Sequence, residues 1–413
     1  MISSPLHEQT YSLDHKTFTE TLATTENLLI IQDLDGVCMG LVKDPLTRKI
    51  SPDYIRATQK FDSHFFVLTN GEHEGRRGVN RIVENAFAKA DKVSYLPGLA
   101  AGGVQWQTRL GQIFHPGVSD AELDFLAAVP NLIRQRLTQF FGENDQYFPA
   151  AKQQALVQAA VLDNLVSPTA NLNVLAEHLQ ADLAIYLKLQ KAIATLLDDL
   201  LEKAATQSLD NSFFVHYAPN LGRDEAGKEI VRFATDSDSG TTDFQFMLRG
   251  AVKEAGVPVL LNHYYYQRTG TYPLGATFNA RQAPQANSAL LQLVKDHFDP
   301  ALMPLTVGVG DTVTSQTDGE TVRRGGSDRL FLQLIQDIGA WAKSGNLVTY
   351  IDSSQDELKN RIPLKLGTVN GKTKVISGIT DPADPLCINV AFPGGFAQYT
   401  AAFQQAAAQR QTA

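Results

Sequence analysis

The sequence predicts an α/β fold built on an open parallel sheet, with a large α+β insertion. Three apolar runs lead to this prediction, because each ends abruptly in a polar, glycine-bearing turn: Leu28–Ile31, Phe65–Leu68 and Leu305–Val309. Unbroken apolar runs are typical of strands that are buried on both faces of a parallel sheet. Ligands of such sheets bind beyond the carboxyl ends of the strands, which is where these turns lie.

Helical segments lie between and after the three strands. The first strand leads into the turn 32–36, the second into 69–71 and the third into 310–312. Segments Gly78–Lys89 and Ser327–Ser344 carry helical patterns. An alternation of strands and helices favours a parallel sheet, because neighbouring parallel strands need a long crossover connection.

The chain changes character between the second and third strands. Residues 119–207 show helical periodicity, with leucines at positions 175, 179, 183 and 187. We interpret this leucine stripe as core packing, with a partner-binding coiled coil as the alternative. Three strand-like segments follow it: Phe213–Tyr217, Glu229–Phe233 and Val257–Tyr266.

We therefore predict a discontinuous core with a cap domain inserted into it. Residues 1–115 and 285–413 would form the core, and residues 116–284 the cap, with a helical half and a small sheet. The cap also contains the polar loop Asp236–Asp243. We interpret this loop as a plain turn, because its spacing is not that of an EF-hand calcium site.

Composition restricts the classes of partner. The 413 residues include 36 basic and 44 acidic residues, which gives a formal net charge of −8 and disfavours nucleic acid or an anionic membrane as a partner. The two cysteines, Cys38 and Cys387, are too few for a disulfide framework and indicate a reducing compartment. We see no secretory signal and no apolar run that approaches the ~20 residues of a membrane span. We expect a soluble, cytoplasmic protein.

Two carboxylates follow the first strand. Asp33 and Asp35 are two residues apart, so their side chains are expected to point the same way. Gly36 then allows a sharp turn. Two carboxylates aimed at one point either hold a divalent cation or divide the roles of nucleophile and acid/base, and the alternative is a solvated turn.

These residues resemble the signatures of a known family, the haloacid dehalogenase-like (HAD) phosphatases. Segment Ile31–Val37 resembles the first family signature, Val67–Asn70 the second and Val309–Asp311 the fourth, in the family's order. The resemblance implies a HAD-like, Rossmannoid parallel-sheet core with an inserted cap. It also implies a phosphatase that depends on magnesium.

The resemblance assigns roles to individual residues. Asp33 would attack phosphorus, and Asp35 would protonate the leaving oxygen and then activate water. The Thr69 hydroxyl would bind the transferring phosphoryl group. Mg²⁺ would be held by Asp33, Asp311 and the backbone carbonyl of Asp35.

The loop after Thr69 is expected to face the substrate. We predict that Asn70, Gly71 and Glu72 bind it. The segment Gly71–Glu74 contains two glutamates and a histidine, which is a composition that also occurs in metal sites. We interpret it as a solvated or substrate-facing loop.

The sequence departs from the family pattern in two places. The lysine or arginine of the third signature is absent from its expected place; we prefer Arg281, with Lys295 and Lys253 as alternatives. The second acid of the fourth signature would fall at Ser315, and the candidates for it are Asp318 and Asp328. Asp328 is alternatively a helix N-cap.

A narrower resemblance covers nearly the whole chain. It is carried by segments 33–40, 67–72, 310–315 and 324–329. It implies a small-molecule sugar phosphate as substrate, specifically the 3-phosphate of a glucosylated glycerol, dephosphorylated to a compatible solute of salt-stressed bacteria. The alternatives are another sugar phosphate such as sucrose 6-phosphate, or a non-catalytic sugar-phosphate-binding regulator. The sequence makes no prediction of oligomeric state.

Overall fold

The computed structural model describes residues 4–88, 93–225, 227–318, 321–358 and 361–410. Its larger sheet has eight strands in the order β18-β15-β12-β1-β2-β3-β4-β5. The strands from β18 to β3 are parallel, and β4 and β5 continue the sheet antiparallel. The strands are β18 (Val390–Phe392), β15 (Leu347–Ile351), β12 (Leu305–Gly310), β1 (Leu28–Gln32), β2 (Phe65–Leu68), β3 (Gly98–Ala100), β4 (Gln105–Gln107) and β5 (Ile113–Phe114).

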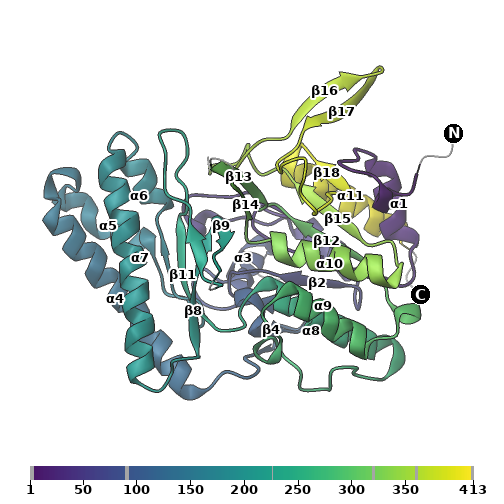
Figure 1. Ribbon diagram of the computed structural model, residues 1–413, viewed down its shortest axis with the longest axis horizontal. Coiled ribbons are helices and arrows are strands. Elements are labelled where there is room, and N and C mark those ends of the chain that lie inside the picture. Colours follow the sequence, from purple (N-terminus) through teal and green to yellow (C-terminus); the bar gives the residue numbers. More distant parts are fainter. Residues whose placement is uncertain (1–3, 89–92, 226, 319–320, 359–360, 411–413) are drawn as a thin grey trace.

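Helices cover both faces of this sheet (Figure 1). One face packs on α1 (His15–Thr24), α2 (Pro52–Gln59), α3 (Val79–Ala86) and α11 (Gly395–Gln409). The other face packs on α8 (Lys253–Thr269), α9 (Asn287–His297) and α10 (Arg329–Ala342). Successive residues of β1 enter opposite cores, Leu28 and Ile30 on one side and Leu29 and Ile31 on the other. This arrangement confirms the α/β fold and explains why β1 is apolar at consecutive positions.

A second, smaller unit is inserted between β5 and α8. It has an antiparallel sheet in the order β6-β7-β11-β8, formed by β6 (Val161–Leu162), β7 (Thr169–Asn171), β11 (Asp243–Leu248) and β8 (Phe213–Ala218). Its helices are α4 (Asp120–Glu143), α5 (Ala150–Ala160), α6 (Asn173–His178) and α7 (Leu183–Thr206). The helices and this sheet enclose a hydrophobic core of their own.

The structure also contains three two-stranded antiparallel hairpins. These are β9 (Asn220–Arg223) with β10 (Glu229–Val231), β13 (Thr314–Asp318) with β14 (Thr321–Gly325), and β16 (Lys365–Val369) with β17 (Lys372–Ser377). The last hairpin projects from the molecule at the top of Figure 1. No helix among the described residues is both long and apolar enough to cross a membrane.

The leucine stripe lies in the core of the inserted unit, as predicted. Leu175 and Leu179 are fully buried there, and Leu183 and Leu187 pack against the same core. The stripe is divided between α6 and α7, so it does not form one continuous helix.

The strand predicted at Val257–Tyr266 is wrong, because this segment lies inside helix α8. A continuous apolar run fits a buried strand and a buried helix equally well, and α8 is buried on most of its surface. Because α8 packs on β1, β2 and β3, it belongs with the large sheet. The domain boundaries at 115 and 284 remain predictions, and this packing favours an end of the insertion before Lys253.

Candidate active site

The ends of three neighbouring strands bring the predicted acidic residues together. Asp33 follows β1, Thr69 follows β2 and Asp311 follows β12. Carboxylate oxygens of Asp33, Asp311 and Asp328 lie within 4.8 Å of one another, and all three residues are buried. Gly36 has φ of 76°, and a Cβ there would lie 2.3 Å from Oδ2 of Asp311. Only glycine therefore fits at this point of the turn.

Lys253 places a positive charge against two members of this cluster, Asp33 and Asp328. Its Nζ lies 2.6 Å from Oδ2 of Asp33 and 2.6 Å from Oδ1 of Asp328, and its side chain is 1% exposed. Burial by itself would lower the pKa of Lys253, but the carboxylates of Asp328 and Asp33 raise it above its ordinary value. Burial raises the pKa of Asp33 to about 7, Lys253 opposes this rise, and Asp328 adds to it.

Asp328 orients the turn after β12. Its Oδ2 accepts hydrogen bonds of 2.9 Å from the backbone N–H groups of Asp311 and Thr312. It occupies the N-cap position of α10, but its side chain caps no N–H of that helix, so the alternative of a capping role is wrong. A Cβ on Gly310 would lie 2.7 Å from Oδ2 of Asp328, so this approach requires glycine.

The preferred third-signature candidate, Arg281, lies elsewhere. It sits in a short 3₁₀ helix, Ala280–Gln282, where it pairs with Glu122 and donates to the carbonyl oxygens of Ser212 and Arg249. The structure does not bring it to Asp33, because these contacts hold it beside the start of α4. Lys295 is exposed on α9.

The second acid of the fourth signature would fall at Ser315, and Asp318 is the other candidate for it. Ser315 donates a hydrogen bond of 2.9 Å to Asp381. The side chain of Asp318, at the end of β13, lies outside the described residues.

Asp35 lies at the edge of the cluster and not in it. Its carboxylate is 32% exposed and accepts a hydrogen bond of 2.9 Å from Nη1 of Arg48. Arg48 is itself held, because it donates to the carbonyl oxygens of Pro45 and Arg77. The sequence reasoning missed Arg48, since an isolated arginine in a loop carries no recognisable pattern.

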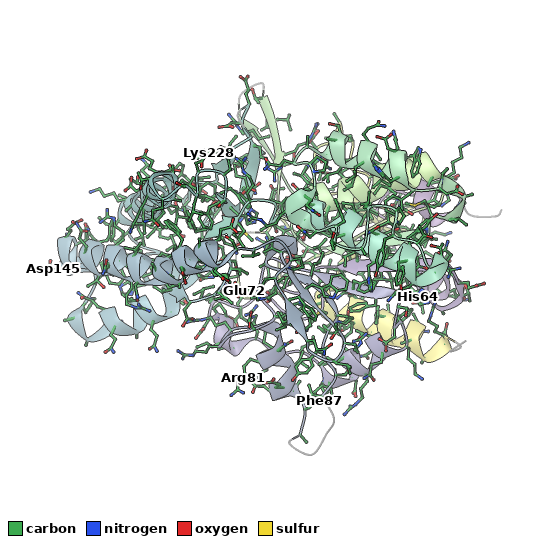
Figure 2. All side chains as sticks on the ribbon, turned by 90° about the horizontal axis from the view of Figure 1, so that it is seen from below. His64, Glu72, Arg81, Phe87, Asp145 and Lys228 are labelled. Atoms are coloured by element: carbon green, nitrogen blue, oxygen red, sulfur yellow. The ribbon has the colours of Figure 1, made fainter. Side chains whose placement is uncertain are left out.

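The loop after Thr69 joins the core to the inserted unit. Nδ2 of Asn70 lies 2.9 Å from Nε2 of His216 on β8. Glu72 is 3% exposed, and its carboxylate accepts four hydrogen bonds of 2.7–2.9 Å from the backbone N–H groups of residues 165–167 and the Ser167 hydroxyl. Figure 2 shows Glu72 where the insertion meets the large sheet. The loop is not solvated at Glu72 or His73, which are both buried. Asn70, Gly71 and Glu72 line the cavity at Asp33, and their contact with a substrate stays a prediction.

The donor set fits a divalent cation. Burial raises the pKa of Asp311, and Asp328 adds to this rise while Arg361 opposes it. Asp33 experiences the same crowding of negative charge. A cation placed between them would relieve the repulsion, and carboxylate oxygens are the ligands that Mg²⁺ prefers. Asp328 completes the group of carboxylates that could contribute.

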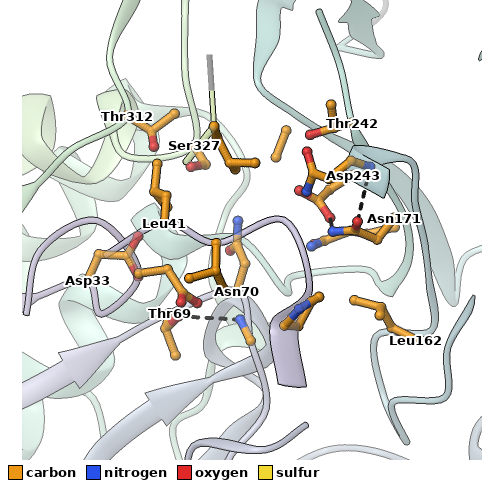
Figure 3. A pocket seen from close by; sticks show the side chains of 18 of the residues that line it. Asp33, Leu41, Thr69, Asn70, Leu162, Asn171, Thr242, Asp243, Thr312 and Ser327 are labelled. Carbon is orange, nitrogen blue, oxygen red and sulfur yellow. Dashed lines mark hydrogen bonds between the residues drawn. The ribbon is translucent and has the colours of Figure 1, made fainter. Parts of the chain in front are cut away.

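A cavity of about 150 Å³ connects this cluster to the inserted unit. Figure 3 shows Asp33 and Thr69 on one side and Asn171, Thr242 and Asp243 on the other. Burial raises the pKa of Asp243 to about 6, although Asn171 donates a hydrogen bond to it. Asp243 was interpreted as the end of a plain turn. The polar–apolar alternation of residues 243–246 is the signal that places it on a strand.

A family model and a known protein both match nearly the full length of this chain, and both point to the same family. The sequence model of the glucosylglycerol-phosphate phosphatase family matches residues 27–407. A glucosylglycerol-phosphate phosphatase from Synechocystis sp. is 62% identical over 414 residues, which cover 98% of each chain.

Two solved structures are distantly similar. One is Aspergillus fumigatus trehalose-6-phosphate phosphatase, at 9% identity and a TM-score of 0.37, with 97% of this chain and 99% of that chain covered. The other is the C-terminal domain of C. albicans trehalose-6-phosphate phosphatase, at 9% identity and a TM-score of 0.45, with 97% and 100% covered.

Proposed function

The chain belongs to the glucosylglycerol-phosphate phosphatase family, and we propose from this premise that it hydrolyses 2-O-(α-D-glucosyl)-sn-glycerol 3-phosphate through an aspartyl-phosphate on Asp33. The products would be phosphate and glucosylglycerol, a compatible solute made under salt stress. The observation that carries the mechanism is the contact of Lys253 with Asp33 at the carboxyl end of β1, beside Asp311.

The reaction would proceed in two displacements. In the first, a carboxylate oxygen of Asp33 bonds to phosphorus, the bond from phosphorus to the glycerol oxygen breaks, and the Asp35 carboxyl gives that oxygen its proton. In the second, the Asp35 carboxylate takes a proton from water while the water oxygen bonds to phosphorus, and the bond to Asp33 breaks. Phosphate leaves and both aspartates return to their starting forms.

Two side chains would hold the phosphoryl group during these steps. Lys253 supplies a fixed positive charge next to Asp33, and the Thr69 hydroxyl supplies a hydrogen bond from the end of β2. Arg48 would hold the Asp35 carboxyl in position through the contact between them. Lys253, one of the two alternatives to Arg281 in the sequence, would therefore fill the role of the third-signature cation.

We propose that Mg²⁺ is held by the Asp33 and Asp311 side chains and the Asp35 carbonyl, with Asp328 close by. When bound, the ion supplies positive charge against the phosphate dianion. Without such charge, two like unit charges ~4 Å apart would repel by ~4 kcal/mol at an effective dielectric of ~20. We further propose that the enzyme is cytoplasmic and acts on a small sugar phosphate. We propose that neither nucleic acid nor a membrane is a partner, because a formal net charge of −8 disfavours binding to either polyanion.

Phosphate release from a panel of substrates tests the proposed specificity. We expect kcat/KM for glucosylglycerol 3-phosphate to exceed the values for sucrose 6-phosphate, glycerol 3-phosphate and p-nitrophenyl phosphate by more than about tenfold. Loss of the glucosyl group should also lower kcat, because binding energy from the remote sugar supports the chemistry at phosphorus. Similar kcat/KM values across the panel would overturn the substrate and leave the phosphatase chemistry standing.

A further inference from the structure

The small sheet of the inserted unit has one apolar and one polar face. Along β11, Phe244 and Phe246 are fully buried in the core formed with the helices. Asp243 and Gln245 alternate with them and line the cavity that contains Asp33. A strand in this position needs only its apolar face for folding, so the polar face is available for another purpose.

The neighbouring strand extends the polar face. Asn171 on β7 is the register partner of Asp243, and its Nδ2 donates a hydrogen bond of 2.7 Å to Oδ1 of Asp243. Asn171 also lines the cavity and is 4% exposed. This contact fixes the carboxylate and the amide side by side. Oδ1 of Asn171 accepts a hydrogen bond of 3.2 Å from the backbone N–H of Asn173, and Oδ2 of Asp243 faces the cavity as an acceptor.

Two polar atoms on the wall of this cavity, one just before β11 and one on it, are buried without a partner. Within the part of the chain that the structure describes, no group hydrogen-bonds to Oγ1 of Thr242 or to Oε1 of Gln245. Buried polar atoms are nearly always paired in folded proteins, because leaving one unpaired is unfavourable. Their position on the cavity wall indicates that the missing partner comes from a bound molecule.

The polar face lies opposite the catalytic carboxylates. The same cavity is lined by Asp33 and Thr69 at one end and by Asn171, Asp243 and Gln245 at the other, as Figure 3 shows for four of these residues. A substrate whose phosphate is held at Asp33 would therefore direct its remaining groups toward β7 and β11.

Resting on the phosphatase function proposed above, we propose that Asn171, Asp243 and Gln245 form the subsite that binds the hydroxyl groups of the glucosyl moiety. Each sugar hydroxyl both donates and accepts a hydrogen bond. The Asp243 carboxylate accepts from hydroxyls, while the two amides offer both functions. A site built to pair with hydroxyls rejects molecules that lack them, because its own buried groups would stay unpaired.

Substrate pairs with and without the glucosyl group test this subsite. Asp243→Asn and Gln245→Leu should each lower the ratio of kcat/KM for glucosylglycerol 3-phosphate to that for glycerol 3-phosphate by about tenfold or more. Asp236→Asn is the matched control, because Asp236 lies on the exposed loop before β11 and outside this cavity. This control should keep the ratio of the wild type. Thermal unfolding of every variant separates misfolding from a change in recognition.

Deoxy analogues of the glucosylated substrate provide a readout that a merely structural role would not change. A variant that has lost its contact with one hydroxyl should lose little further on the analogue that lacks the same hydroxyl. If the variants keep the wild-type ratio within about twofold, the subsite is overturned while the proposed function stands. If the wild type itself shows no preference for the glucosylated substrate, the proposed function is overturned instead.

Discussion

Nζ of Lys253 lies 2.6 Å from Oδ2 of Asp33, although the inserted unit separates the two residues in the sequence. The lysine is the first residue of α8, and it also contacts Asp328. One ammonium group thus joins the end of β1 to the start of α10. This arrangement makes Lys253 a phosphate-binding candidate and a structural element at the same time.

Replacement of Lys253 by methionine should lower kcat by about 10²-fold or more, because the fixed positive charge next to the phosphoryl group is lost. Steady-state kinetics checks this, with circular dichroism to confirm that the variant is folded. Arg281→Met and Lys295→Met should change kcat by less than about threefold, since neither residue contacts Asp33. A large loss in Arg281→Met together with an active Lys253→Met would reverse this assignment.

Asp33→Asn should abolish turnover while preserving the fold, because the amide has the shape of the carboxylate but cannot attack phosphorus. Residual kcat is expected below about 1% of the wild type. Mass spectrometry of wild-type enzyme trapped with a phosphate mimic should locate the adduct on Asp33. An adduct on another residue would rule out this nucleophile.

Activity should require Mg²⁺ and vanish in EDTA, and Asp311→Asn should raise the Mg²⁺ concentration needed for half-maximal activity. The reason is the convergence of Asp311 and Asp33 within the same acidic cluster. Titration of metal-free enzyme with Mg²⁺ measures this, followed either by activity or by the shift in melting temperature. Full activity without any divalent cation would contradict the prediction.

Glu72→Gln should lower the free energy of unfolding by about 2 kcal/mol, because the amide offers only one acceptor oxygen and its NH₂ group then faces a buried backbone N–H. Urea denaturation measures the change. Glu177→Gln is the matched control. Glu177 in the insertion forms an ion pair with Lys43 in the core, so it also links the two parts, but its side chain is 54% exposed. Exposed pairs contribute little, so this control should change stability by less than about 1 kcal/mol. Equal effects would show that burial of Glu72 is unimportant.

The stability of the protein should fall in mild acid because of His73. Burial lowers the pKa of His73 from 6.5 to about 4. Between pH 6.5 and 4 the unfolded chain binds a proton at His73 and the folded chain does not. The free energy of unfolding therefore has its full value above pH 6.5 and decreases as the pH falls toward 4. Between pH 7 and 5, wild type should lose about 2 kcal/mol more than His73→Phe.

Urea denaturation at the two pH values measures this difference. His297→Phe serves as the control, because His297 is exposed at the end of α9 and its replacement should leave the wild-type pH dependence in place. Parallel losses in wild type and His73→Phe would show that other groups cause the acid sensitivity.

The acidic part of the site could be predicted from sequence, because Asp33 and Asp311 directly follow buried strands whose carboxyl ends meet. The sequence offers Lys253 only as one of three candidates for the cation and prefers Arg281 to it. The role of Lys253 depends on how the start of α8 packs against the end of β1, which is decided by tertiary contacts between distant segments. Arg48 acts through one contact with Asp35 from a loop, and the sequence around it carries no periodic pattern.

Two local structures could not be predicted from the sequence, the helix at Val257–Tyr266 and the strand that begins at Asp243. Val257–Tyr266 is apolar at most positions, so neither a period of two nor a period of 3.6 stands out, and burial on nearly all sides conceals the helix. Asp243 ends the polar loop 236–243 and begins β11, and the alternation that follows it is too short to stand out beside the loop. In both segments the composition hides the periodicity that would identify the element.

The position of β1 between β2 and β12 has a consequence for synthesis on the ribosome. Residues 33–304 separate β1 from β12. One edge of β1, at Leu28–Ile31, therefore stays unpaired with β12 while these residues are synthesised. At roughly 5–20 residues per second, the delay is on the order of 15 to 55 s. An unpaired apolar edge is a template for aggregation. The strand that carries the nucleophile is therefore completed on both sides only after about three quarters of the chain has been translated.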